Sequence, residues 1–240
     1  IERLLLEAEN LQRAGETYAG KDTGTLSVAA THTQTRYVLP RAVQNFRTTY
    51  PHVRIALQQS APEHIAEWVL SGKADIGIAT EGLSRFDELV SFPCYQWHHV
   101  IVVPDGHPLL KLKRVTLDNL ASYPLITYDK GFTGRSHIDE AFRDEGVEPD
   151  IVLTAMDSDV IQQYVSLGLG VGIVASMAAE QLPRGLKSIA ASHLFATNIT
   201  RIAVRRGAFL REYAVDFIRQ LAPKVTLKEL AGVVNWRRQA

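Results

Sequence analysis

Residues 25–37 decide the fold of the chain, and their sequence is Thr25-Leu26-Ser27-Val28-Ala29-Ala30-Thr31-His32-Thr33-Gln34-Thr35-Arg36-Tyr37. The first six residues form a strand-like run, the next seven are mostly polar, and we expect a helix to begin just after them, near residues 38–40. A strand that leads through a short polar turn into a helix is the first part of a βαβ unit. This stretch therefore predicts an α/β fold with mostly parallel sheets.

The same alternation continues along the chain. Further strand-like runs are predicted at 53–59, 75–79, 100–104, 125–128, 151–155, 172–174 and 200–204, with helices at 38–49, 62–71, 134–144, 159–167 and 209–221. Residues 94–195 carry their own strands and helices, so we predict two Rossmann-like subdomains instead of one sheet. The first subdomain comprises 21–93 and 196–240, the second comprises 94–195, and two strands cross between them. Ligands of such folds bind beyond the carboxyl ends of strands and at domain interfaces, which predicts a ligand cleft between the subdomains.

The first 20 residues have a different pattern. Apolar or small residues recur there at alternating spacings of three and four, which is typical of the seam of a coiled coil; they are Ile1, Leu4, Ala8, Leu11, Gly15 and Tyr18. We expect a linker helix over 1–20 that pairs with a partner chain and connects to a domain upstream of this fragment. The alternative is an amphipathic helix that packs on its own domain.

Composition excludes several classes of protein. Lysine plus arginine and aspartate plus glutamate both number 26, so the net charge is zero, whereas DNA-binding domains usually carry a basic surplus. We therefore do not expect this fragment to bind DNA alone. No apolar run approaches the roughly 20 residues that span a bilayer. The single Cys94 permits no internal disulfide, and no Cys/His spacing predicts a metal site, which together favour a cytoplasmic protein.

The polar run after the first strand is the main candidate site. Thr31, Thr33 and Gln34 offer hydroxyl and amide donors at the start of the expected helix, where backbone N–H groups are also free. Such neutral donors suit a small oxyanion such as sulfate. Ordinary N-capping is the alternative, but one Thr would suffice for it. His32 could also donate, and its protonation would strengthen anion binding at low pH.

Several other segments could contribute to the same site. Thr133, Gly134 and Arg135 lie in a second glycine-rich turn between a strand and a helix, which lacks the Gly-Lys-Ser/Thr ending of a phosphate-binding P-loop. A plain loop with an N-cap is the alternative there. Thr80 ends the strand at 75–79. For Trp97, the sequence leaves two alternatives: it lines the pocket or it packs in the core. Asp157 begins a predicted helix, and its carboxylate could meet an ammonium group of a ligand.

Two other patterns carry no site. Glycines at 168, 170 and 172 follow a helix and precede a strand, whereas a dinucleotide-binding loop has the opposite order; we predict a helix C-cap and a turn. A nucleophilic Cys94 would need a base, and the adjacent His98 and His99 would point to opposite faces of a strand. Cys94 is better explained as a small buried residue. We therefore predict no enzyme, no catalytic residue and no cofactor.

Four segments resemble the CysB and Cbl subgroup of LysR-type transcriptional regulators. They are Thr31-His32-Thr33-Gln34-Thr35-Arg36-Tyr37 with Leu39-Pro40, Ala74–Glu81, Phe132-Thr133-Gly134-Arg135-Ser136, and Asp157-Ser158-Asp159-Val160-Ile161 leading to Leu167–Gly172. The resemblance extends to about Pro223, and the Thr-His-Thr-Gln and Gly-Phe-Thr-Gly-Arg-Ser runs are its most specific parts. The tail after Leu221 matches nothing specific.

The resemblance implies a fold and a function. Members combine an N-terminal winged helix-turn-helix, which is not in this chain, with a dimerising linker helix and a periplasmic-binding-protein-like effector module of two subdomains. They are usually tetramers on promoter DNA of sulfur-assimilation or sulfonate-utilisation genes. In the subgroup, positions matching Thr31, Thr33, Gln34, Thr80 and Thr133 bind sulfate, and the Trp97 position is nearby. The implied effectors are sulfate, thiosulfate, adenosine phosphosulfate and O- or N-acetylserine.

The sequence thus predicts an effector-sensing and oligomerisation module, in which a ligand favours one arrangement of the subdomains and so changes the spacing of the DNA-binding heads. The alternative is a stand-alone solute-binding protein for sulfate-like oxyanions, which has the same two-lobed architecture.

Overall fold

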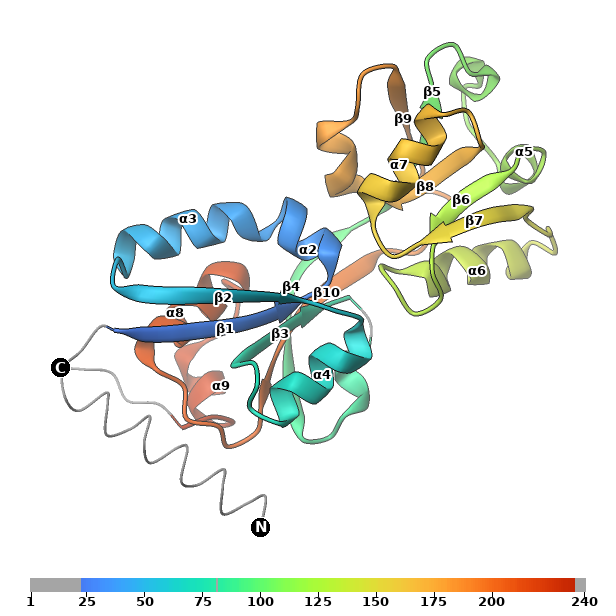
Figure 1. Ribbon diagram of the computed structural model, residues 1–240. Helices are drawn as coiled ribbons and strands as arrows, with labels where there is room; N and C mark the ends of the chain where they lie inside the picture. Colours follow the sequence, from blue (N-terminus) through green and yellow to red (C-terminus); the bar gives the residue numbers. More distant parts are fainter. Residues whose placement is uncertain (1–22, 81, 236–240) are drawn as a thin grey trace. The chain divides into compact units, whose positions relative to one another are not determined.

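The computed structural model describes residues 23–80 and 82–235, and they form two compact units (Figure 1). Of the described residues, unit 1 contains those up to Tyr95 and from Thr200 onward, whereas unit 2 contains Gln96–Ile199. The chain therefore passes between the units twice. The expected exchange points, 93/94 and 195/196, lie two and four residues earlier. The linker helix predicted over residues 1–20 lies outside the described residues.

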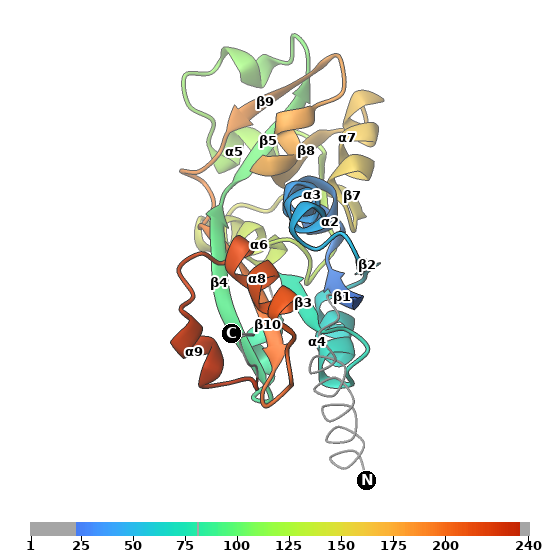
Figure 2. The same ribbon diagram turned by 90° about the vertical axis from the view of Figure 1, so that its left-hand side faces the viewer.

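Unit 1 is built on a five-stranded sheet with the order β2-β1-β3-β10-β4. Its strands are β1 (Gly24–Ala30), β2 (Val53–Gln59), β3 (Ile76–Ala79), β4 (Leu89–Trp97) and β10 (Asn198–Arg205). Strand β1 pairs in parallel with both β2 and β3, while β10 runs antiparallel to β3. Strands β10 and β4 lie side by side at one end of this order (Figure 2). Both are also the strands in which the chain passes between the units.

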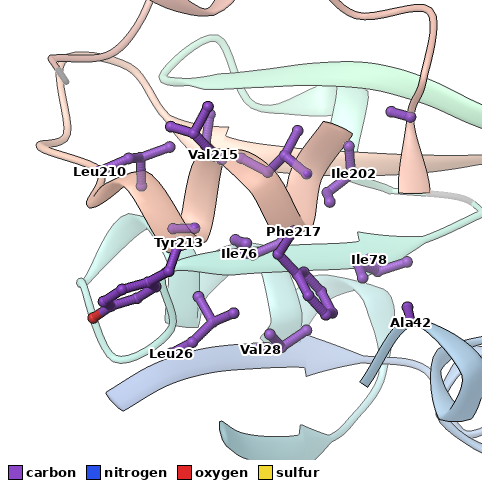
Figure 3. Close-up of a cluster of buried hydrophobic side chains, with 14 of the residues drawn as sticks. Leu26, Val28, Ala42, Ile76, Ile78, Ile202, Leu210, Tyr213, Val215 and Phe217 are labelled. Carbon is purple, nitrogen blue, oxygen red and sulfur yellow. The ribbon is translucent and has the colours of Figure 1, made fainter. Parts of the chain in front are cut away.

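Helices cover both faces of the unit 1 sheet because alternate side chains of its strands point to opposite faces. The helices are α2 (His32–Tyr37), α3 (Leu39–Thr49), α4 (Pro62–Leu70), α8 (Glu212–Leu221) and α9 (Leu227–Ala231), with a 3-10 turn η1 (Leu83–Arg85). Leu26 and Val28 of β1 pack with Phe217 of α8 and with α3, as Figure 3 shows. Ala29 points the other way and packs with Ile65 of α4.

The tail after Leu221 is part of this unit. Val225 and Leu230 are buried in the same cluster as Phe217, and α9 begins with a capping box in which Thr226 and Glu229 satisfy each other's backbone N–H groups. The segment, for which the sequence suggested no role, therefore completes the core of unit 1.

Unit 2 has a sheet of the same kind, with the order β7-β6-β8-β5-β9. Its elements are β5 (His99–Pro104), η2 (Pro108–Lys111), α5 (Leu117–Ala121), β6 (Leu125–Tyr128), α6 (Arg135–Asp144), β7 (Ile151–Ala155), α7 (Ser158–Ser166), β8 (Val171–Ala175), η3 (Ser176–Gln181) and β9 (Leu186–Ala190). Strand β6 is parallel to β7 and β8, whereas β5 is antiparallel to β8 and β9.

A glycine lies beneath a helix at an equivalent point of each unit. A Cβ atom on Gly77 of β3 would be 2.9 Å from Val69 Cγ2 of α4, and one on Gly172 of β8 would be 2.8 Å from Val165 Cγ2 of α7. Glycine therefore allows each helix to pack closely on the third strand of its sheet order. The turn predicted before β8 is also present, since Gly168 has a φ of +77° and its N–H donates to the Val165 carbonyl after α7.

All eight predicted strands are present, with ends within two residues of the prediction. Two strands were missed: β4 contains Pro93 and has no clear alternation, and β9 is a half-exposed edge strand. The helix predicted to start near 38–40 is present as α3, but the short helix α2 that precedes it was not predicted. Helix α2 begins at His32, because Thr31 is still extended and its carbonyl accepts the first helical bond, from Thr35 N–H at 3.1 Å. Among the described residues, no helix is long and apolar enough to cross a membrane.

Candidate functional site

The polar run after β1 forms the first turn of α2. Thr31 N–H donates to the Ile78 carbonyl at 3.2 Å, which holds the start of α2 beside the end of β3. The Thr31 hydroxyl accepts no hydrogen bond from the turn, so the N-capping alternative is wrong for this side chain. His32 is half-buried, while Thr33 and Gln34 have no exposed surface. The candidate residues therefore lie inside the unit instead of on a surface loop.

Two buried donors of this turn are unused. Within the described part of the chain, neither Thr33 Oγ1 nor Gln34 Nε2 has a hydrogen-bond partner. Such groups are rare in folded proteins, because a buried polar atom without a partner costs about 1–3 kcal/mol. A hydroxyl and an amide NH₂ on adjacent residues can both donate to an acceptor. The turn therefore has the chemistry of a binding site for an acceptor-rich group.

Tyr95 of β4 fixes the orientation of the Gln34 amide. Its hydroxyl donates to Gln34 Oε1, so the NH₂ group of Gln34 is the part left unpaired. Burial raises the pKa of Tyr95, and a hydrogen bond with Thr200 lowers it by less, so the phenol stays protonated and can donate at neutral pH. This role of Tyr95 was not predicted, since residues 89–97 were not expected to form a strand.

Thr80 lies just beyond the end of β3, as the sequence predicted. Its hydroxyl is 3.5 Å from that of Thr200 on β10, and Thr200 is itself buried. Thr31, Thr33, Gln34 and Thr80 thus belong to the ends of two neighbouring parallel strands. Tyr95 and Thr200 are the members of this cluster that the sequence analysis missed.

The second cluster is in unit 2, in the loop of residues 131–134 that precedes α6. Thr133 is buried and has a φ of 42°, which makes it the non-glycine residue with a left-handed backbone among the described residues. Gly131 and Gly134, on either side, have φ values of 83° and 72°. Thr133 Oγ1 has no partner in the described part of the chain. This loop therefore presents a second unused buried hydroxyl.

Two side chains support the loop. His99 Nε2 is 3.1 Å from the Thr133 carbonyl, and His99 Nδ1 is 3.4 Å from Asn198 Nδ2. His99 and Asn198 are both fully buried. Burial lowers the pKa of His99 to about 4, a hydrogen bond to the Thr133 backbone opposes that shift, and His137 and His98 add to it. The imidazole is therefore neutral at physiological pH.

The remaining predicted residues of unit 2 have structural contacts of their own. Arg135 donates to Asp139 Oδ1 at 2.6 Å and to the Tyr128 carbonyl, so its guanidinium anchors α6. Asp157 is the N-cap of α7 and accepts a hydrogen bond from Val160 N–H at 2.9 Å, as predicted for a helix start. Neither group needs a ligand to explain its position. Gly134 is the N-cap residue of α6.

Trp97 and Ser158 complete the surroundings of His99 and Tyr128. Trp97 is 4% exposed, and its ring lies edge-on to His99 with the centroids 5.0 Å apart. This burial is compatible with both alternatives for Trp97, since Thr33 and Gln34 are buried to a similar degree. Ser158, buried at the start of α7, is 2.6 Å from the Tyr128 hydroxyl, which accepts a bond from Ala175 N–H.

Cys94 and the two histidines do not form a nucleophile and base. The Cys94 side chain packs against the core of unit 1, and its burial raises the thiol pKa to about 12. His99 is buried in unit 2, whereas His98 lies between β4 and β5, with Nδ1 3.4 Å from the Thr197 hydroxyl. The thiol is protonated at neutral pH, which makes it a poor nucleophile.

The fold and the unused donors define a class of protein: an α/β ligand-binding module with two sheet-based units and buried neutral donors at strand ends. Comparison with known proteins gives the family. The model of the LysR substrate-binding domain matches residues 19–225, and the chain belongs to this family of transcriptional regulators.

Several relatives of high sequence identity are HTH-type transcriptional regulators. The chain is 51% identical to the HTH-type transcriptional regulator SsuR of Burkholderia cenocepacia, over 98% of this chain and 77% of the relative. It is also 51% identical to the regulator CysB of the same organism, over 95% and 73%. The crystal structure of the cofactor-binding domain of the Cbl regulator is 44% identical, with a TM-score of 0.85 over 88% of this chain and 92% of that one. Because all three relatives are transcriptional regulators, the comparison does not support the alternative interpretation of a stand-alone solute-binding protein.

Proposed function

We propose that this domain senses a small sulfur-linked anion, or an acetylated serine, through Thr31, Thr33, Gln34, Thr80 and Thr133. The observation that carries the proposal is the pair of buried, unused donors Thr33 Oγ1 and Gln34 Nε2. The resemblance of these positions to the sulfate-binding positions of the CysB and Cbl subgroup supports it.

The chemistry of the donors favours an anion whose oxygens only accept hydrogen bonds. Sulfate is fully ionised at neutral pH and has no proton to donate. Tyr95 occupies Gln34 Oε1, so that the amide presents its N–H groups to a ligand. The hydroxyls of Thr33 and Thr133 can also donate. Hydrogen bonds to a charged ligand are roughly twice as strong as neutral ones, so neutral donors suffice to hold an oxyanion.

The effector would act on transcription through the rest of the regulator. We propose that the full protein binds promoter DNA of sulfur-assimilation or sulfonate-utilisation genes as a homodimer or homotetramer in the cytoplasm. A ligand changes such a protein only by binding one of its states more tightly, and a shift from mostly off to mostly on requires a differential of about 5 kcal/mol in total. Several subunits can share this requirement.

Calorimetric titration tests the proposal. Sulfate, thiosulfate, adenosine phosphosulfate, O-acetylserine and N-acetylserine are each titrated into the 240-residue chain, and we expect saturable binding of at least one. The Thr33→Val variant keeps the side-chain shape and removes the donor, so it should weaken binding of that ligand roughly tenfold or more.

Thr35→Val provides the matched control. Thr35 lies on the same helix, and its hydroxyl already donates to the Thr31 carbonyl at 3.1 Å. The same substitution there should leave affinity nearly unchanged. If no ligand binds at millimolar concentration, or if Thr33→Val binds as the unmodified chain does, the site is not at this turn.

A further inference from the structure

The conformation of Thr133 needs an external cause. A β-branched residue avoids the left-handed region, which costs a non-glycine residue about 1–2 kcal/mol relative to the right-handed one. Gly131 and Gly134 tolerate their positive φ values at no such cost, but Thr133 does not. Such conformations persist where surrounding contacts over-determine them, and they gather at ligand sites.

Two contacts of the loop bear on this conformation. The Arg135 N–H donates to the Phe132 carbonyl at 2.9 Å across Thr133 and Gly134, and His99 forms a hydrogen bond with the Thr133 carbonyl. A carbonyl can only accept, so His99 Nε2 must carry the proton and donate at 3.1 Å. His99 Nδ1 is then an acceptor, which matches the NH₂ group of Asn198 at 3.4 Å. The reverse tautomer would place two acceptors against each other at Thr133. His99, Thr133 and Asn198 therefore have one consistent set of donors and acceptors.

Two further contacts hold this arrangement in place. The His99 ring is fully buried and lies edge-on to Trp97 and to Phe195, with centroids 5.0 and 5.6 Å away. Asn198 lies against Gly134, where any side chain would overlap its amide: a Cβ atom there would be 2.7 Å from Asn198 Cγ. The imidazole and the amide thus have little freedom to rotate, so the direction of the N–H donor to Thr133 is fixed.

We propose that His99 is a positioning residue for the effector site: through its Nε2–H bond to the Thr133 carbonyl, it holds Thr133 left-handed and keeps its hydroxyl free for the ligand. This inference rests on the proposed function, because it takes Thr133 as a ligand contact. His99 itself does not touch the ligand. Its effect is to increase the fraction of molecules in which the Thr133 loop is already in its binding conformation.

A matched pair of substitutions separates this role from simple packing. The Nε2 of glutamine can take the place of the imidazole Nε2, so His99→Gln keeps a donor for the Thr133 carbonyl. His99→Asn is shorter, so its amide can meet Asn198 but cannot reach Thr133. Both variants replace a buried ring with a buried amide. A purely structural role predicts that the shorter and the longer amide change ligand affinity only in proportion to stability.

The measurement is sulfate affinity, or that of whichever effector binds the unmodified chain, together with the free energy of unfolding. We expect His99→Asn to raise Kd roughly 5- to 30-fold, since a Thr133 released from the left-handed region occupies it that much less often. His99→Gln should restore most of the affinity. Backbone amide NMR signals of residues 132–134 should shift in His99→Asn without ligand and stay near their original positions in His99→Gln.

Thr133→Val distinguishes failure of the inference from failure of the proposed function. If Thr133→Val binds the effector with unchanged affinity, Thr133 is not a ligand contact, and the part of the proposed function that assigns it to the binding site is wrong. If Thr133→Val loses affinity but folded His99→Asn does not, the site stands and the role of His99 is refuted. Equal losses in His99→Asn and His99→Gln, with the NMR signals of the loop unchanged in both, would also refute it.

Discussion

Gly134 provides a direct test of how tightly the Thr133 loop and Asn198 are packed. Its φ of +72° is left-handed, and a Cβ atom would overlap the Asn198 amide. Gly134→Ala should therefore carry two costs. The backbone conformation alone costs alanine about 1–2 kcal/mol. Displacing Asn198 also breaks its hydrogen bond to His99 and leaves buried polar groups unpaired, which adds about 1–3 kcal/mol. The sum is a loss of about 2–5 kcal/mol.

Gly146→Ala isolates the first cost. Gly146 has a φ of +67°, and a Cβ atom there would meet nothing within 4 Å. Urea unfolding of the two variants, followed by circular dichroism, gives their free energies of unfolding. We expect Gly134→Ala to lose about 1–3 kcal/mol more than Gly146→Ala, because both share the backbone cost and differ in the contact with Asn198.

A double variant tests whether Asn198 is the cause. In an Asn198→Ala background the amide is gone, so Gly134→Ala should then cost about as little as Gly146→Ala does. The reasoning is refuted if Gly134→Ala is no worse than Gly146→Ala in the unmodified chain. It is also refuted if the Asn198→Ala background leaves the penalty unchanged.

Three other outcomes are expected. Gly172→Ala should lower the free energy of unfolding by about 1–3 kcal/mol through overpacking against α7, and adding Val165→Ala should recover part of that loss, both measured by urea unfolding. Because burial lowers the pKa of His99 from 6.5 to about 4, folding favours its neutral form; the resulting stability is complete above pH 6.5 and is lost as the pH falls from 6.5 toward 4, by up to about 3 kcal/mol. His99→Gln should flatten that part of the stability–pH curve. Cys94, with its raised thiol pKa and half-buried side chain, should react with iodoacetamide at pH 8 much more slowly in the folded chain than in urea, as followed by mass spectrometry.

The strands and helices that carry strong periodicity could be predicted from the sequence. Residues 53–59, 125–128 and 151–155 were placed without error, because β-branched and apolar residues dominate these short runs between turn signals. The two missed strands have weaker patterns: Pro93 interrupts β4, and β9 is half-exposed. Their positions are determined by pairing with distant strands, such as β9 with β5, which no local pattern reveals.

The candidate site was predictable only in part for the same reason. Thr31, Thr33 and Gln34 could be recognised because polar residues accumulate after a strand in numbers that a cap does not need. Arg135 had the same signal, but its guanidinium binds Asp139 and the Tyr128 carbonyl. A sequence does not show whether a buried polar group already has a partner within the protein.

Asn198 and Thr200, which contact the candidate site residues or their supports, show most clearly what could not be predicted from the sequence. Asn198 and Thr200 are two positions apart at the start of β10, so their side chains point to the same side of the strand, and both are fully buried. Thr200 lies beside Thr80, 120 positions earlier, while Asn198 meets His99, 99 positions earlier. In the sequence, Asn198 and Thr200 are only two polar residues at the start of a strand, and nothing near them indicates these contacts. The chain returns to unit 1 through β10, and this topology places Thr200 against Thr80 and Asn198 against His99, which in turn contacts Thr133. Local chemistry was therefore enough to propose the candidate ligand-binding residues, whereas the residues that contact and orient them required the fold.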